Sequence, residues 1–108
     1  MANYSDEAEA SAAGLRIVHE PNQHRFAVYQ SEPQGDRLVG EAHYSLIEDS
    51  IIDFDHTVVL PELRGSGIAT LLAQRALDPE VIGSRRVHAS CWFITGYLKR
   101  HPEALPSA

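Results

Sequence analysis

One short segment of the chain, Leu63-Arg64-Gly65-Ser66-Gly67-Ile68-Ala69-Thr70, carries residue types that suit the binding of an anion. Its two glycines let the backbone turn tightly and approach a ligand closely. An apolar stripe of helical period follows, so the amides of the segment are expected to be the first, unpaired amides of a helix. Such amides and the helix dipole attract phosphates, and Arg64 adds a permanent positive charge. The segment therefore predicts a diphosphate site.

Two other kinds of phosphate-binding loop fit this segment less well. A Walker loop needs a lysine directly after its second glycine, whereas Gly67 is followed by Ile68. A dinucleotide-binding fingerprint needs a third glycine where Thr70 stands, within a larger parallel α/β framework. The alternative without a ligand is a turn whose glycines only cap the helix and pack against it.

Composition and charge restrict the class of protein. With 108 residues, of which 44% are apolar and 22% charged, the chain has the composition of one small globular domain. The net charge of −6 argues against nucleic acid as the main partner. The acidic excess lies in residues 1–61, whereas residues 62–108 are slightly basic, so an anionic ligand fits the C-terminal half better.

The sequence also argues against a secreted, membrane-bound or metal-binding protein. A single cysteine excludes an internal disulfide, and the polar N-terminus has no apolar run typical of a secretory signal, so we expect a cytoplasmic protein. No apolar run approaches the roughly 18 residues of a membrane span, so no membrane association is expected. The six histidines show no ligand spacing to one another, and no metal site is expected.

Short apolar segments separated by turn residues predict a sheet whose first four strands form an antiparallel meander. Turns are expected at Pro21-Asn22, Pro33–Asp36 and Glu48–Ser50. The predicted strands are Leu15–His19, Arg25–Gln30, Leu38–Ile47, Ile51–Leu60 and Arg85–Ser90.

Two helices are predicted on either side of the fifth strand. The main helix spans Ser66–Leu77 and stops at Asp78-Pro79, because a residue that precedes proline avoids the helical region. The second helix spans Trp92–Arg100 and ends before Pro102. The chain is expected to divide into a flexible tail, one domain and a loose end, at residues 1–13, 14–103 and 104–108.

Strict alternation along the fourth predicted strand places His56 among apolar residues. On that face His56 is either a general base or a core histidine bonded to a main-chain carbonyl. The opposite face carries Asp53 and Asp55, whose carboxylates are expected to be solvated. The residues that share the face of His56 are Ile52, Phe54, Val58 and Leu60.

Several motifs resemble those of the GNAT superfamily of N-acetyltransferases. Arg64, Gly67 and Ala69 match, in order, its acetyl-CoA signature of Arg or Gln, two residues, Gly, one residue, and Gly or Ala. The chain is most similar to very short GNAT-like proteins that lack the usual N-terminal helices, over about residues 15–103. Ala89 and Trp92 depart from that pattern, which commonly has prolines there. The matching segments are His56–Val59, Pro61–Ala69, Cys91–Phe93 and His101–Glu103.

The resemblance implies an α+β, GNAT-like (acyl-CoA N-acyltransferase) fold with a twisted, mostly antiparallel sheet of about five strands and two helices, in which the fourth and fifth strands splay apart. It implies transfer of an acetyl group from acetyl-CoA to a primary amine on an unidentified protein or small molecule. Acetyl-CoA is then a co-substrate, held through its pantetheine arm and its pyrophosphate. The implied binding residues are Val58, Val59, Leu60, Arg64, Gly65, Ser66, Gly67, Ile68, Ala69 and Thr70.

The resemblance also implies that Cys91 lies near the thioester. Its thiol is then a transient acetyl acceptor, a group that positions the amine, or a buried structural thiol. His56 is the predicted base that takes a proton from the amine. Two other functions stay open, namely a module that binds acetyl-CoA or CoA without efficient turnover, and a thiol-based redox or interaction protein with a purely structural glycine loop.

Overall fold

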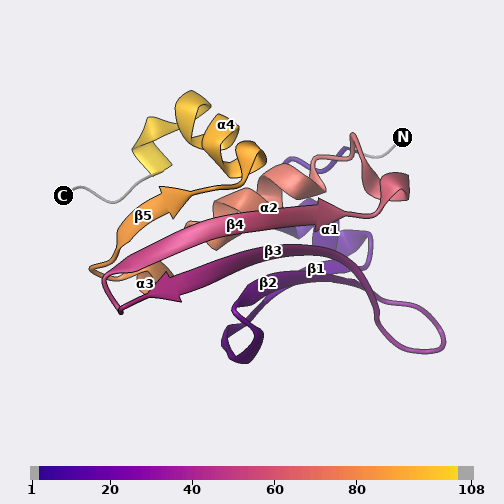
Figure 1. The fold of residues 1–108 in the computed structure, drawn as a ribbon. Helices are drawn as coiled ribbons and strands as arrows, with labels where there is room; N and C mark the ends of the chain where they lie inside the picture. The colour runs from indigo at the N-terminus through magenta and orange to yellow at the C-terminus, as the bar shows by residue number, and fades with distance from the viewer. Residues whose placement is uncertain (1–2, 105–108) are drawn as a thin grey trace.

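The computed structural model describes residues 3–104, in which five strands and four α-helices form a two-layer α+β arrangement (Figure 1). Short 3₁₀ turns at Pro21–Gln23, Pro61–Leu63 and Pro102–Ala104 join or follow these elements. Residues 1–2 and 105–108 of the two predicted tails lie outside the described residues. The elements are α1 Glu7–Ala12, β1 Leu15–Glu20, β2 Arg25–Gln30, β3 Arg37–Ile47, β4 Ile51–Val59, α2 Ile68–Ala76, α3 Pro79–Ile82, β5 Arg86–Ala89 and α4 Trp92–Arg100.

The five strands form one sheet in the order β1-β2-β3-β4-β5. The first four are antiparallel neighbours, as short turns between them require, and β5 lies parallel to β4 after the crossover through α2 and α3. The α+β class and the mostly antiparallel sheet are therefore confirmed. Two further short helices, α1 and α3, add to the two helices that were predicted.

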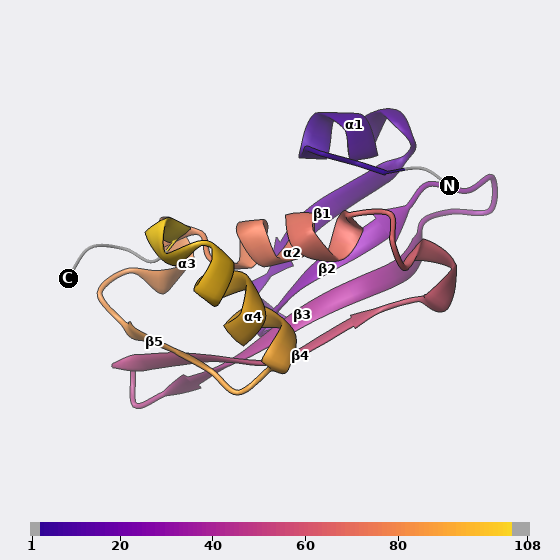
Figure 2. The ribbon, with the colours of Figure 1, turned by 90° about the horizontal axis from the view of Figure 1, so that it is seen from above.

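The helices lie on one face of the sheet, and the core forms between the two layers (Figure 2). Helix α2 packs its predicted apolar stripe, which includes Leu71, Leu72 and Ala76, against β2, β3 and β4. Phe26 and Phe54 contribute the largest fully buried side chains from the sheet. The other face of the sheet carries polar and half-exposed side chains, among them an Arg25 that pairs with both Glu20 and Glu41.

A β-bulge in β4 changes which side chains face the core. His56 pairs with His43 while Phe54 pairs with the next residue, Tyr44, so Asp55 is an extra residue in β4. Beyond the bulge the alternation is reversed, and His56 is exposed whereas Thr57 faces inward and is half-buried. The prediction that His56 lies on the apolar face is therefore wrong, because it assumed an uninterrupted strand.

Helix α1 packs against the core, within a segment that the sequence predicted to be a tail. The Asp6 carboxylate accepts a hydrogen bond from the Glu9 amide and caps the helix. Ala10 is buried in the core cluster, and Glu7 forms an ion pair with Arg75 of α2. A single buried alanine leaves no apolar period in the sequence, so the residues alone do not predict that this segment packs against the core.

The Asp78-Pro79 pair ends α2, as predicted, and also begins α3. The Asp78 carboxylate accepts a hydrogen bond from the Glu80 amide, and Pro79 occupies the first helical position. Ile82, the last residue of α3, is fully buried. Across residues 3–104, every helix is too short or too polar to span a lipid bilayer.

The burial of Ala10 can be tested by placing a carboxylate at neighbouring positions of α1. We expect Ala10→Asp to lower the free energy of unfolding by about 1–3 kcal/mol, because it forces a charge into the core or detaches the helix. Ala8→Asp, at an exposed position of the same helix, is the control and should change it by less than about 0.5 kcal/mol. Urea unfolding measures both, and equal effects would contradict the described packing of α1.

Candidate functional site

The glycine loop between β4 and α2 adopts a conformation that depends on its glycines. Gly65 and Gly67 have φ angles of 79° and 88°, in the left-handed region that other residues rarely occupy. The Ser66 amide and hydroxyl both bond to the Leu63 carbonyl, which closes the turn. Gly67 then forms the N-cap of α2, so the loop leads directly into the first turn of that helix.

The loop presents main-chain donors without partners. Within residues 3–104, the amides of Gly65, Gly67, Ala69 and Thr70 donate to no other group. The first turn of α2 contains no acidic side chain, so the positive end of the helix dipole is not neutralised locally. A group of free amides at a helix N-terminus is suited to an anion.

A cavity of about 300 Å³ lies against this loop. Val58 is 42% exposed, and its side chain points to the face of the sheet away from the helices, because it follows the bulge. Ser66 and Ile68 are buried, and the Leu60 amide donates to the Val39 carbonyl. Six of the predicted binding residues line the cavity, whereas Val58, Leu60, Ser66 and Ile68 do not. Its lining residues are Asn3, Val59, Leu63, Arg64, Gly65, Gly67, Ala69 and Thr70.

Strands β4 and β5 separate next to Cys91. Their last paired residues are Phe54 and Ala89, and the Cys91 amide donates to the Phe54 carbonyl at 3.0 Å. Strand β4 continues to Val59 beyond this point, whereas the segment after β5 turns into α4. Over residues 55–59 the side of β4 away from β3 therefore has no strand partner among the described residues.

Cys91 occupies the N-cap of α4 and is 8% exposed. Its thiol donates to the Thr57 hydroxyl at 3.5 Å, so Thr57 is the side chain that the bulge brings to the cysteine. His56 lies on the other face of β4, and the structure does not bring it together with Cys91. Sequence reasoning missed Thr57, although the polar run Asp55-His56-Thr57 inside a strand is the signal that indicates a break in alternation.

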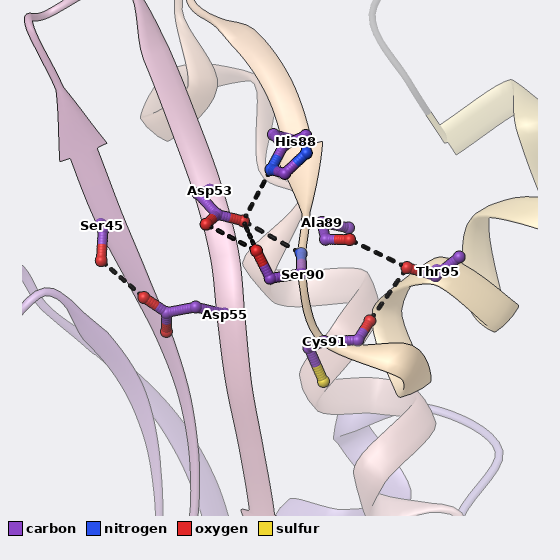
Figure 3. Close-up of polar contacts among 8 residues, drawn as sticks. All are labelled: Ser45, Asp53, Asp55, His88, Ala89, Ser90, Cys91 and Thr95. Atoms are coloured by element: carbon purple, nitrogen blue, oxygen red, sulfur yellow. Dashed lines mark hydrogen bonds and ion pairs between the residues drawn. The ribbon is translucent and has the colours of Figure 1, made fainter.

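Asp53 holds the end of β5 in place from the outer face of the sheet (Figure 3). Its carboxylate accepts hydrogen bonds from the Ser90 amide at 3.0 Å, from the Ser90 hydroxyl at 2.8 Å and from His88 Nδ1 at 3.2 Å. Asp55 turns away towards β3, where it accepts a bond from the Ser45 hydroxyl. The two carboxylates therefore do not form a pair, and Asp53 is not merely solvated as expected.

The hydrogen bonds to Asp53 favour its charged form. Burial alone would raise the pKa of Asp53, but the bonds from Ser90 and His88 outweigh burial and hold this pKa below its ordinary value of 3.8. The carboxylate is thus ionised at neutral pH and positions Ser90, the residue directly before Cys91. On the other side, Thr95 donates to the carbonyls of Ala89 and Cys91 at 3.0 Å each (Figure 3), so the turn from β5 to α4 is held at both ends.

Two aromatic residues of α4 differ sharply in their surroundings. Trp92, directly after Cys91, is 83% exposed. Tyr97 is buried in the core, and its ring centroid lies 4.6 Å from that of His101 in a tilted arrangement. The structure therefore gives Tyr97 a packing role and leaves a large apolar ring uncovered beside the cysteine.

A second cavity, of about 390 Å³, lies near α3. His19, Tyr44 and Arg85 are among its lining residues, and the Tyr44 hydroxyl lies 2.7 Å from His19 Nε2. Burial lowers the pKa of His19 and raises the pKa of Tyr44. The neutral imidazole of His19 can therefore accept a hydrogen bond from the Tyr44 hydroxyl. In the described part of the chain, no three His, Cys, Asp or Glu side chains come together as metal ligands would.

The fold and the site define the class of protein. A glycine loop that leads into the crossover helix α2, and a parallel β4–β5 pair that separates beyond Phe54, are features of a GNAT-like α+β domain.

The chain belongs to the family described as GCN5-related N-acetyl-transferase, which it matches over residues 25–106. It is 35% identical to Protein NATD1 of Mus musculus over 88 residues, which are 82% of this chain and 77% of that protein. It is 34% identical to Protein NATD1 of Bos taurus over 98 residues, or 91% and 84% of the two chains. Protein NATD1 of Danio rerio is 30% identical over 88 residues, which cover 82% and 77%. The predicted GNAT-like family and fold are thereby confirmed.

The role of Asp53 predicts a pH dependence of stability. Because its pKa is lower in the folded protein, its contribution is fully present above pH 3.8 and is lost as the pH falls through the folded-state pKa. Asp53→Asn should therefore be less stable than the wild type at pH 7, and this difference should shrink below about pH 4. Urea unfolding at several pH values measures it, with Asp55→Asn as the control for loss of a nearby exposed carboxylate. A difference that is constant across this pH range would contradict the proposed role.

Proposed function

We propose that this protein is an N-acetyltransferase that moves an acetyl group from acetyl-CoA to a primary amine. The observation that carries the proposal is a group of four amides in the glycine loop and the first turn of α2 that have no partner within residues 3–104. A diphosphate is the ligand that satisfies several main-chain donors at one helix end. Membership of an N-acetyltransferase family supports a coenzyme A ester as the molecule that carries this diphosphate.

The rest of the coenzyme is proposed to follow the separated part of β4. No strand of the described chain pairs with that side of β4 over residues 55–59, so an extended arm with amide groups can pair with it as a strand would. Such pairing uses main-chain atoms, and the outward side chain of Val58 does not prevent it. Because the Leu60 amide already bonds to Val39, Leu60 would contribute through other atoms.

The acetyl group would then lie near Cys91 and Thr57. In the reaction the amine nitrogen attacks the thioester carbonyl carbon, the carbon–sulfur bond breaks so that coenzyme A leaves as its thiolate, and a base removes the proton of the amine. A main-chain amide of β4 is suited to polarise the carbonyl, because its position is fixed by the sheet. Cys91 is proposed either to accept the acetyl group first or to position the amine, and Asp53 secures the turn that carries it. His56 stays a predicted base, although it would have to act from the other face of β4.

A second candidate function is a module that binds coenzyme A esters without efficient turnover. Two observations favour it, namely that Cys91 is largely covered and that His56 lies on the opposite face of β4 from Cys91. A measurement of binding and a separate measurement of turnover distinguish the two functions.

Binding can be measured through the thermal stability of the protein. Acetyl-CoA at 100 times its Kd should stabilise the folded state by about 2.7 kcal/mol and raise the unfolding temperature. Arg64→Gln should weaken binding about three- to tenfold, because it removes a positive charge from the cavity that the loop lines. Arg86→Gln is the control, since it makes the same change at an exposed position on β5. An unfolding temperature that acetyl-CoA leaves unchanged at millimolar concentration would rule out the proposed function.

Turnover can be measured with a panel of primary amines and acetyl-CoA. We expect Cys91→Ala to reduce kcat by about tenfold or more while the affinity for acetyl-CoA stays within about threefold, because the thiol is proposed to act on the acetyl group. His56→Ala should reduce kcat about a hundredfold if His56 is the base. Intact mass spectrometry of the wild type without amine shows whether Cys91 becomes acetylated. Binding without turnover for every amine would favour the second candidate function.

A further inference from the structure

Residues Asn3–Asp6, here called the N-terminal strap, lie across the glycine loop. The Tyr4 amide donates to the Ser66 carbonyl at 2.6 Å, and the Tyr4 side chain packs against the core. The strap is fixed at its far end, because Asp6 caps α1 and Ala10 of that helix is buried. Its position on the loop is therefore held from both sides.

The strap approaches the loop so closely that a side chain at Gly67 would collide with it. A Cβ at Gly67 would lie 2.6 Å from the main-chain oxygen of Tyr4 and 2.9 Å from Asn3 Oδ1. Gly67 is thus needed for this contact as well as for its φ of 88°. The strap and the loop form one packed unit around the cavity.

The strap bonds to the loop without using the donors that a ligand needs. The strap donates a hydrogen bond to the Ser66 carbonyl. The amides of Gly65, Gly67, Ala69 and Thr70 stay without partners among the described residues. A segment that mimicked an anion would instead accept bonds from these amides. The strap is therefore a wall of the cavity, and Asn3 is one of the cavity's lining residues.

The acidic residues that follow Asn3 are engaged elsewhere. Asp6 accepts a bond from the Glu9 amide, Glu7 pairs with Arg75, and Glu9 accepts bonds from Ser5. The side chain that the strap adds to the cavity is the neutral carboxamide of Asn3, which carries two N–H donors. A carboxamide at this position can donate to a phosphate oxygen without adding repulsion.

We propose that Asn3 is a ligand-binding residue that contacts the diphosphate of a coenzyme A ester, and that the main chain of Tyr4 holds it in place. This inference rests on the proposed function and adds a contact from the N-terminal segment to the same site. The proposed binding site thereby includes residues that precede the first strand in sequence and meet the glycine loop only in the folded structure.

The direct test measures CoA binding by isothermal titration calorimetry for Asn3→Asp, which keeps the size of the side chain and adds a negative charge. We expect an affinity at least about tenfold weaker than the wild type, and a smaller difference at high salt because the repulsion is screened. Asn22→Asp is the matched control at an exposed position in the turn between β1 and β2, and it should bind CoA as the wild type does. Circular dichroism of each variant is the control for folding.

A second pair of variants tests the role of the Tyr4 main chain. Tyr4→Pro removes the amide that bonds to Ser66 and should weaken CoA binding about threefold or more, whereas Tyr4→Ala keeps the amide and should bind more tightly than Tyr4→Pro.

Two results would overturn the inference while leaving the proposed function intact. The first is that the wild type and the Asn3→Asp variant bind CoA with the same affinity. The second is that the Tyr4→Pro variant binds CoA more tightly than the wild type, because the strap competes with the ligand. A wild type that does not bind CoA would instead remove the proposed function, and this inference with it.

Discussion

The proposed site depends on main-chain N–H groups in the glycine loop and the first turn of α2 that have no acceptor among residues 3–104. Because β4 and β5 are parallel, the chain has to cross over between them, and the crossover starts at the glycine loop. The loop closes on itself through Ser66 and Leu63, and so leaves the amides of Gly65, Gly67, Ala69 and Thr70 without a partner in the described chain. Free donors of this kind at a helix N-terminus are suited to an anionic ligand. The crossover topology therefore also determines where the proposed ligand site lies.

The second constraint is the extra residue in β4. The bulge at Asp55 turns Thr57 towards the helices and His56 away from them, and it lies where β4 loses its parallel neighbour. Cys91 begins α4 at that same point and contacts Thr57, while Asp53 and Thr95 fix the turn that carries the cysteine. A local irregularity thus decides which polar side chains share a face with the cysteine and which face the solvent.

Much of the fold could be predicted from the sequence, because its signals are local. The predicted strands and the two longer helices lie within one or two residues of their observed bounds, since turns at Pro21 and Glu48 and the proline at Pro79 mark their ends. The glycine loop was found because two glycines before an apolar stripe have a direct physical meaning. The bulge was missed because one inserted residue changes no composition, and its consequence for His56 was therefore predicted wrongly. Helix α1 and the contact of Tyr4 with Ser66 join segments far apart in the sequence, which no local pattern records.

The central claim is that the amides of the glycine loop hold the diphosphate of coenzyme A, and an NMR titration of the ¹⁵N-labelled protein with CoA tests it most directly. The account predicts that the largest amide shifts occur at Gly65, Gly67, Ala69 and Thr70, because these groups gain a hydrogen-bond acceptor. Unchanged amides at these four residues in saturating CoA would contradict it, as would shifts concentrated around the second cavity at His19 and Arg85.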